Sequence, residues 1–167
     1  MVTGMFRDRA SAEAAYGSLS ERGYSKDDVN LMMSDETRQT HFANDGTETE
    51  LGSKAMEGAG VGSAIGGTLG ATIAAIAAIG TAVALPGLGL IIAGPLAAAL
   101  AGAGAGGLTG GLIGALVGSG IPEEHAKQYE QGIKEGGIVM GVNPRNNEDA
   151  DYIENQFRSS RGESIYR

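Results

Sequence analysis

Hydrophobic and polar positions in residues 1–33 follow a strand pattern, then a helix pattern, then a strand pattern again. Apolar and polar positions alternate in the opening segment VTGMF, which predicts a short strand. The next apolar residues recur at i, i+3, i+4 and i+7, and these are Ala12, Ala15, Tyr16 and Leu19. This spacing predicts a helix, which Asp8 can cap at its start and Gly23 can end. The segment DVNLMMS predicts a second strand with Val29, Leu31 and Met33 on one face.

Residues 122–167 show a similar pattern in the order helix, strand, helix and strand. The first helix is expected to begin at Pro122 and to end before Gly136 and Gly137. Its buried side carries Ala126, Tyr129 and Ile133. The segment GIVMGVNP predicts a strand, NEDADYIENQF predicts a helix, and ESIYR predicts an edge strand. The apolar face of the second helix consists of Ala150, Ile153 and Phe157.

Between these two parts, glycine recurs at every fourth position in a stretch without any charged residue, from Gly58 to Pro122. The expected helix-packing positions are Gly58, Gly62, Gly66, Gly70, Gly102, Gly106, Gly110, Gly114 and Gly118. The two series mirror each other about a centre near Leu88, as two antiparallel helices joined by a turn would require. The turn is expected at the helix-breaking residues Pro86, Gly87, Gly89 and Pro95.

Glycine at these positions opposes helix formation unless it allows close packing. Each glycine in a helix costs about 0.8–1 kcal/mol relative to alanine, so the series costs on the order of 8 kcal/mol. That is comparable with the whole stability of an ordinary domain. A missing side chain lets a second backbone approach closely, as in the small-residue packing of membrane helices. We therefore expect a glycine-zipper hairpin whose helices pack together where water is excluded.

The predicted fold class is α+β: a ferredoxin-like sandwich, split by a long antiparallel α-helical glycine-zipper hairpin. We expect a four-stranded sheet with helices on one face. Residues 1–33 form its N-terminal β-α-β half, and residues 122–167 form its C-terminal half. Residues 34–57 form a solvated polar linker with a turn of helix at its end, and residues 58–121 form the hairpin. Neither flank of roughly 40 residues could sustain a core alone, so the two halves are expected to fold together.

The length of the hairpin fits a bilayer, although its apolarity is modest. A helix from Gly58 to Leu85 would be roughly 42 Å long, and a membrane span needs about 30 Å. Its large aliphatic residues supply only about -2 to -4 kcal/mol of insertion energy. The first expectation is a hairpin that enters the inner membrane from the cytoplasmic side and homo-oligomerises. The alternatives are a soluble cytoplasmic oligomer, filament or shell with buried hairpins, and a flexible Gly/Ala linker, against which the regular spacing argues.

Composition and isolated motifs point away from several functions. The net charge of -8 disfavours nucleic acid as a partner, and the absence of cysteine excludes disulfides and thiolate metal sites. The only histidines, His41 and His125, are expected to be surface residues without a metal or catalytic role. A GxGxxG spacing occurs within the repetitive run and follows no predicted strand, so no dinucleotide site is expected at Gly102, Gly104 and Gly107.

Pairs of acidic residues stand at or near the starts of predicted helices or strands, where a capping or solvated role is common. These pairs are Asp27–Asp28, Glu123–Glu124 and Glu148–Asp149. The start, MVTGMFRDRA, lacks the basic and apolar regions of a secretory signal. We therefore expect no catalytic residue, no cofactor, no metal and no small-molecule substrate, so the chain is expected not to be an enzyme.

Three segments of the chain resemble a known family. They are GMFRDRASAEAAYGSLSERGYSKDDVNLM, LPGLGLIIAGPLAAALAGAGAG and, directly after the glycine run, GSGIPEEHAKQYEQGIKEGGIVMGV. These segments look like the small bacterial general-stress proteins, including those described as heat-induced or low-temperature-induced. The resemblance covers nearly the whole chain except residues 34–57 and the last few residues, and His125 stands where that family is commonly acidic or neutral. It implies a stress-associated role and a membrane location, with no established enzymatic activity or cofactor.

The pattern and the resemblance together predict a non-enzymatic, stress-associated protein that self-assembles through its glycine-zipper hairpins, at or in the membrane. Its expected partners are further copies of itself and a lipid membrane. A second hypothesis is a small-molecule sensor, because ferredoxin-like sandwiches often bind ligands between subunits.

Overall fold

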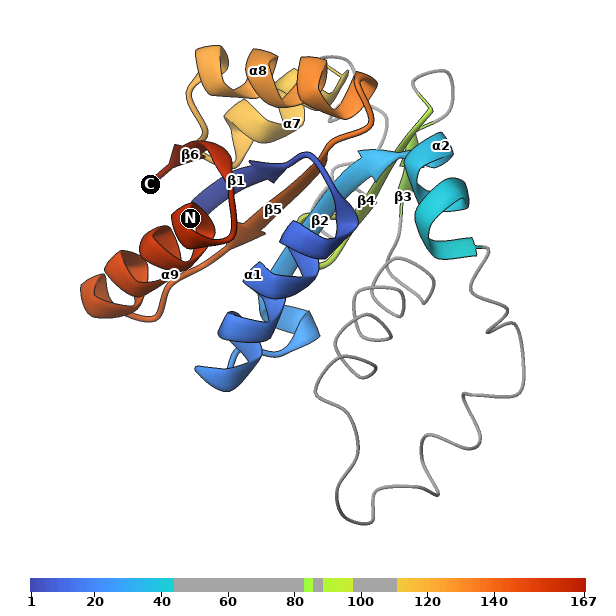
Figure 1. Cartoon of the computed structure of the whole chain (residues 1–167). Helices are drawn as coiled ribbons and strands as arrows, with labels where there is room; N and C mark the ends of the chain where they lie inside the picture. The colour runs from blue at the N-terminus through green and yellow to red at the C-terminus, as the bar shows by residue number, and fades with distance from the viewer. Residues whose placement is uncertain (44–82, 86–88, 98–110) are drawn as a thin grey trace.

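The computed structural model describes residues 1–43, 83–85, 89–97 and 111–167, which form an α+β fold (Figure 1). Its sheet is antiparallel, with six strands in the order β3-β4-β2-β5-β1-β6. These are β1 (Val2–Phe6), β2 (Val29–Ser34), β3 (Val83–Leu85), β4 (Leu90–Ala93), β5 (Ile138–Val142) and β6 (Glu163–Tyr166). The N-terminal and C-terminal parts of the chain share this sheet, because β5 lies between β1 and β2.

Helices cover both faces of the sheet (Figure 1). Helices α1 (Arg9–Glu21) and α9 (Asn147–Ser159) pack on one face, and α7 (Gly111–Gly118) and α8 (Glu123–Lys134) pack on the other. The described part also contains the short elements η1 (Lys26–Asp28), α2 (Asp35–Arg38) and η2 (Gln39–Ala43). The sheet is therefore the middle layer of three.

The chain forms two β-α-β units, β1-α1-β2 and β5-α9-β6, which interleave in the strand order β2-β5-β1-β6. Val142 of β5 pairs in register with Val2 on one side and with Val29 on the other. Residues 35–137 connect the two units. Their described parts add β3 and β4 to the sheet beside β2 and place α7 and α8 over the second face.

Local patterns in the two flanks predicted their elements well. Asp8 caps α1, since its side chain accepts a hydrogen bond from the Ser11 amide at 2.8 Å. Gly23 ends this helix with a φ of 85°. The predicted apolar faces of α1, α8 and α9 are buried, and β6 lies at a sheet edge, as expected. Pro122 is the N-cap of α8 and lies one residue before the helix, whereas we expected it at the first helical position.

The expectation of helices on one face of the sheet is wrong. Val29, Leu31 and Met33 of β2 pack into the core beneath α1 and α9. Met32, which points to the opposite face, is buried in a second core beneath α7 and α8. All five residues of β1 and of β5 are buried too. Apolar side chains on both faces of these strands require two helical layers.

The expected helical hairpin is also wrong at its centre. Residues 83–85 form strand β3 where we expected the end of a helix, and residues 90–93 form strand β4 where we expected part of a turn. The aliphatic run Leu90–Ile92 suits a strand, and the free edge of β2 supplies hydrogen-bond partners from Leu31 to Ser34. Gly89, with a φ of 59°, lies directly before β4, while Pro95 begins a helical turn over residues 95–97. Pro86 and Gly87 lie outside the described residues.

Residues 34–57 differ from the expected linker at their start. Ser34 ends β2 and caps α2 by accepting a hydrogen bond from the Thr37 amide at 3.0 Å. Helical turns therefore occur at the start of this segment, where none was expected, and the turn of helix expected at its end falls in residues 44–57, outside the described part. In the described ranges, no helix has both the length and the apolar character needed to cross a membrane.

Candidate functional site

Helix α7 is the longest helix in the described part of the glycine-rich segment. Leu112, Ala115 and Leu116 recur at i, i+3 and i+4, so they form one face of the helix, and all three are buried. This face packs against α8, and Leu116 belongs to the same cluster of buried residues as Ala126 and Tyr129. Its burial attaches the uncharged segment to the folded domain.

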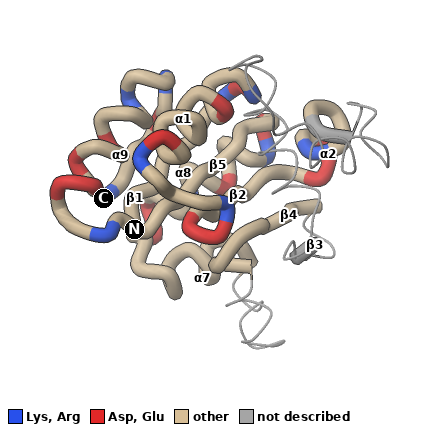
Figure 2. Tube along the Cα trace, turned by 90° about the horizontal axis from the view of Figure 1, so that it is seen from below, with Lys and Arg blue, Asp and Glu red and all other residues tan. Residues whose placement is uncertain are grey.

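The opposite side of α7 is exposed, and it consists of Gly114, Val117 and Gly118. We call it the α7 outer face. A Cβ atom built at Gly114 or Gly118 would have no neighbour within 4 Å. Val117 is 43% exposed, and among the described residues it is the one large hydrophobic residue that is exposed. Figure 2 shows that α7 carries no charge, whereas acidic and basic residues cover α1 and α9.

The structure describes Gly114 and Gly118 among the predicted packing glycines. At neither position does another element of the described chain come within 4 Å of where a Cβ would lie, so close helix packing there stays a prediction. The remaining predicted packing positions, Gly58, Gly62, Gly66, Gly70, Gly102, Gly106 and Gly110, lie outside the described residues.

The chain enters the second part of the glycine-rich segment from a fixed point on the sheet. The buried side chain of Asn30 accepts a hydrogen bond from the Leu96 amide at 2.6 Å and donates one to the Gly141 carbonyl at 3.4 Å. Asn30 therefore satisfies an amide in the first turn of the helix at residues 95–97. Gly94 lies against the backbone of Val29 and Asn30. The hydrogen bond between Asn30 and the Leu96 amide was not predicted from the sequence, because the two residues are 66 positions apart.

A pocket of about 410 Å³ opens between α8 and the strands β1 and β6. Met5, Arg7, Lys127, Gln128, Gln131, Gly132, Glu135, Glu163 and Ser164 line it. Arg7 bridges two carboxylates: its Nη1 lies 2.7 Å from Glu135 Oε2, and its Nε lies 2.9 Å from Glu163 Oε2. About half of each of these three side chains is exposed, so the pocket can be reached from solvent.

Tyr129 connects α8 to both strands behind this pocket. Its hydroxyl donates to the Ser164 carbonyl at 2.6 Å and accepts from the Thr3 hydroxyl at 2.8 Å. Burial raises the pKa of Tyr129 to about 12, against the smaller opposing effect of the Thr3 hydrogen bond. The phenol is therefore neutral at physiological pH and acts as a fixed hydrogen-bonding group.

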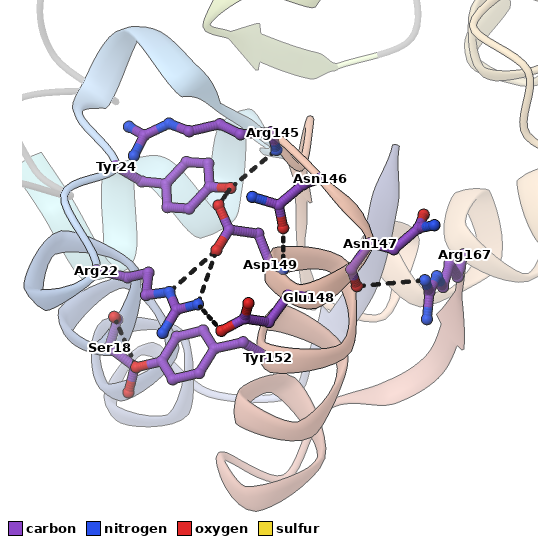
Figure 3. A network of polar contacts seen from close by, with 10 residues as sticks. All are labelled: Ser18, Arg22, Tyr24, Arg145, Asn146, Asn147, Glu148, Asp149, Tyr152 and Arg167. Atoms are coloured by element: carbon purple, nitrogen blue, oxygen red, sulfur yellow. Dashed lines mark hydrogen bonds and ion pairs between the residues drawn. The ribbon is translucent and has the colours of Figure 1, made fainter.

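A polar network joins the two β-α-β units at the start of α9 (Figure 3). The carboxylate of Asp149 accepts hydrogen bonds from the Tyr24 hydroxyl at 2.8 Å and from Arg22 Nε at 3.0 Å. Arg22 also pairs with Glu148 and lies over the Tyr152 ring, 4.8 Å from its centre. Arg145 lies 4.3 Å over the Tyr24 ring centre.

Asp149 is held ionised within this network. Its hydrogen bond from Tyr24, followed by that from Arg22, keeps the pKa of the Asp149 carboxyl below its ordinary value. We expected the pair Glu148–Asp149 to act at the helix start, and both lie in the first turn of α9. The bonds to Arg22 and Tyr24 were missed, because these residues come from a distant part of the chain. The side chains of Arg22 and Tyr24 bond to Glu148 and Asp149, so the network links the two β-α-β units.

Acidic residues that we expected at helix starts have local partners in the structure. In η1, Asp28 forms a capping box with Ser25, and in α8 Glu123 pairs with Lys127 at 2.7 Å. The His125 ring centre lies 4.9 Å from that of Tyr166, and Nδ1 is buried without a hydrogen-bond partner. Across the described residues, no group of three His, Cys, Asp or Glu side chains could hold a metal. Gly102, Gly104 and Gly107 of the GxGxxG spacing lie outside the described residues.

Comparison with known proteins gives no relative: no family model, no curated protein and no solved structure matches this chain.

Proposed function

We propose that this chain is a non-enzymatic protein that self-assembles through its uncharged glycine-rich segment, with the α+β domain as the folded base. The observation that carries the proposal is the α7 outer face. Gly114, Val117 and Gly118 form an uncharged, exposed helix face, while the opposite face of the same helix is buried in the domain.

The chemistry of this face suits contact between helices. Two glycines one turn apart leave a shallow groove in which a second backbone can lie, and Val117 provides an apolar side chain beside it. The glycine series has further members at residues 58–70 and 102–110, so the same packing can extend to both runs, which lie on either side of β3 and β4 in the sequence. Close packing of several copies would offset the helix-propensity cost of the glycines.

Two further parts of the proposal are the ferredoxin-like description of the domain, which rests on the strand pattern, and the location of the assembly, which rests on the resemblance. The interleaved β-α-β units and the strand order β2-β5-β1-β6 support a ferredoxin-like description of the domain, extended by β3 and β4. The resemblance to bacterial general-stress proteins supports a stress-associated assembly at or in the inner membrane, on its cytoplasmic side. A soluble cytoplasmic oligomer, filament or shell with the glycine-rich runs buried inside it is the alternative for the same contacts.

The Gly114→Ala substitution is expected to raise the stability of a single chain but to weaken association between copies. In a single chain, alanine at this open position stabilises α7 by about 0.8–1 kcal/mol. In an assembly that uses Gly114 as a contact, the added methyl group separates the two backbones and weakens association. We expect sedimentation velocity to show smaller species for Gly114→Ala and still smaller ones for Gly114→Leu. Unchanged assembly together with higher stability would contradict the proposal.

Flotation with lipid vesicles distinguishes an assembly in the membrane from a soluble assembly. We expect the expressed full chain to float with lipid vesicles and to remain bound after a carbonate wash. If the chain stays with the soluble fraction but sediments as a large particle in plain buffer, the soluble assembly replaces the membrane assembly. A monomer in both plain buffer and detergent would contradict both forms.

A further inference from the structure

We propose that the pocket between α8, β1 and β6 binds a small organic cation, through an ammonium or guanidinium group. This binding goes beyond self-assembly, and every residue it needs lies within one chain and within the described part. The pocket lies beneath α8 at the β6 edge of the sheet, so it is not formed by the α7 outer face.

The four charged residues that line the pocket, Arg7, Lys127, Glu135 and Glu163, sum to zero, and counting Glu123, the partner of Lys127, leaves one negative charge in excess. Arg7 neutralises only one of the two carboxylates that it bridges, Glu135 and Glu163. Lys127 also lines the pocket, but it pairs at 2.7 Å with Glu123, which does not line it. The chain as a whole carries a charge of -8, which adds to the attraction for a cation. A cationic ligand therefore completes the charge balance, whereas an anion would have to displace a carboxylate from Arg7.

Glu163 is the carboxylate that we expect to receive the ligand. Glu135 already accepts hydrogen bonds from both Arg7 and Gln131, the latter at 2.8 Å. Glu163 accepts one from Arg7, and no other residue in the described ranges donates a hydrogen bond to its side chain. Its remaining acceptor sites can take an N–H group of a ligand, and hydrogen bonds between charged groups are the strong ones.

The rest of the lining suits the carbon chain and the polar end of such a ligand. Gly132 and the side chain of Met5 form an apolar floor, because a Cβ at Gly132 would overlap the Met5 sulfur. The amide side chains of Gln128 and Gln131 can donate and accept hydrogen bonds at the rim. A volume of about 410 Å³ accommodates an alkyl amine or an arginine side chain.

The same cationic group can come from a free amine or from a side chain of a peptide. Saturation-transfer difference NMR with the full chain tests both sources, since the method reports weak binding even when the protein is part of a large assembly. The probes are putrescine and a capped tripeptide with a central arginine, and the same tripeptide with glutamine is the neutral control. We expect transfer to the methylene protons of the cationic probes and none to the glutamine peptide.

Glu163→Gln removes the receiving charge without changing the shape of the side chain. We expect it to weaken binding of the cationic probes about tenfold, as the loss of a hydrogen bond to a charged group implies. Glu154→Gln on α9 is the matched control: it removes the same charge from an ion pair outside the pocket. Binding of one probe alone identifies the source of the cation and supports the site. Absence of transfer to both probes, or equal weakening by the two variants, would overturn the proposal.

Discussion

At the residue scale, Gly89 and Gly94 flank β4 and both adopt positive φ angles, of 59° and 100°. Their surroundings differ. A Cβ at Gly89 would have no neighbour within 4 Å, whereas a Cβ at Gly94 would overlap the Val29 carbonyl oxygen and lie 3.0 Å from Asn30 Cα. Gly94 thus allows the chain to pass directly over β2 before it enters the helical turn at residues 95–97.

The comparison of Gly94→Ala with Gly89→Ala tests this close approach. Gly89→Ala should cost about 1–2 kcal/mol of unfolding free energy, because a side chain is disfavoured in the left-handed region. Gly94→Ala should cost clearly more, since the clashing atoms belong to the backbone and can shift only with the strand. Urea unfolding of the two variants measures the difference. Equal losses would show that the chain does not pack on Val29 as described.

Asp149 provides the pH dependence expected at this scale. The pKa of its carboxyl is lowered in the folded state, so the stability it contributes is present above the unfolded pKa of about 3.9 and is lost as the pH falls through the folded pKa. Asp149→Asn should therefore lower stability at pH 7 and flatten the loss of stability below about pH 4. Unfolding free energies measured from pH 7 downward test this. A constant difference between the two proteins at every pH would contradict it.

At the element scale, α7 has two faces with different expected roles, and paired substitutions separate them. Leu116 is fully buried against α8, so Leu116→Ala should cost about 2–5 kcal/mol in stability. Val117 is exposed, so Val117→Ala should change the stability of the single chain by less than about 0.5 kcal/mol. The second variant should nevertheless reduce assembly, as measured by sedimentation. A large loss of stability in Val117→Ala would place this residue in the core instead.

The elements predicted from sequence were those whose signal is local. The spacing of Ala12, Ala15 and Leu19 identifies α1 with its cap at Asp8, and similar local signals identify α8 and α9. Strands β3 and β4 were missed because glycine spacing dominated the interpretation, while the pairing of Leu31 with Ala93 depends on distant residues. The second helical layer was missed for a related reason: alternation in β1 and β2 was assigned to one buried face, although residues on both faces are buried.

The pocket residues could not have been found from sequence. Arg7 lies 128 positions from Glu135 and 156 positions from Glu163, so only the sheet order brings the three together. In the sequence, each is one charged residue among many. In contrast, the exposed glycines of α7 have a four-residue spacing, which is a local signal in the sequence, and packing at them stays a prediction.

At the scale of the whole molecule, the charged residues all lie in the two flanks of the chain, and the segment between the flanks carries no charge. The net charge of -8 comes entirely from outside the stretch between Gly58 and Pro122. In the described part, α7 connects these two regions, because one side of it is buried in the charged domain and the other side is exposed. In the proposed assembly, the glycine-rich segments would meet at the centre and the acidic domains would lie outside, where mutual repulsion favours their separation.

The absence of cysteine from the chain allows a direct measurement of contact between copies. A disulfide forms only when two Cα atoms come within about 4.4–6.8 Å of each other, so a single introduced cysteine reports whether its own position meets the same position in another copy. Val117→Cys places the thiol on the α7 outer face, and Asn155→Cys places it on the exposed side of α9 as a control. We predict that mild oxidation converts Val117→Cys rapidly to a covalent dimer while Asn155→Cys stays monomeric. Equal rates for the two variants, or no dimer from Val117→Cys, would contradict assembly through this face.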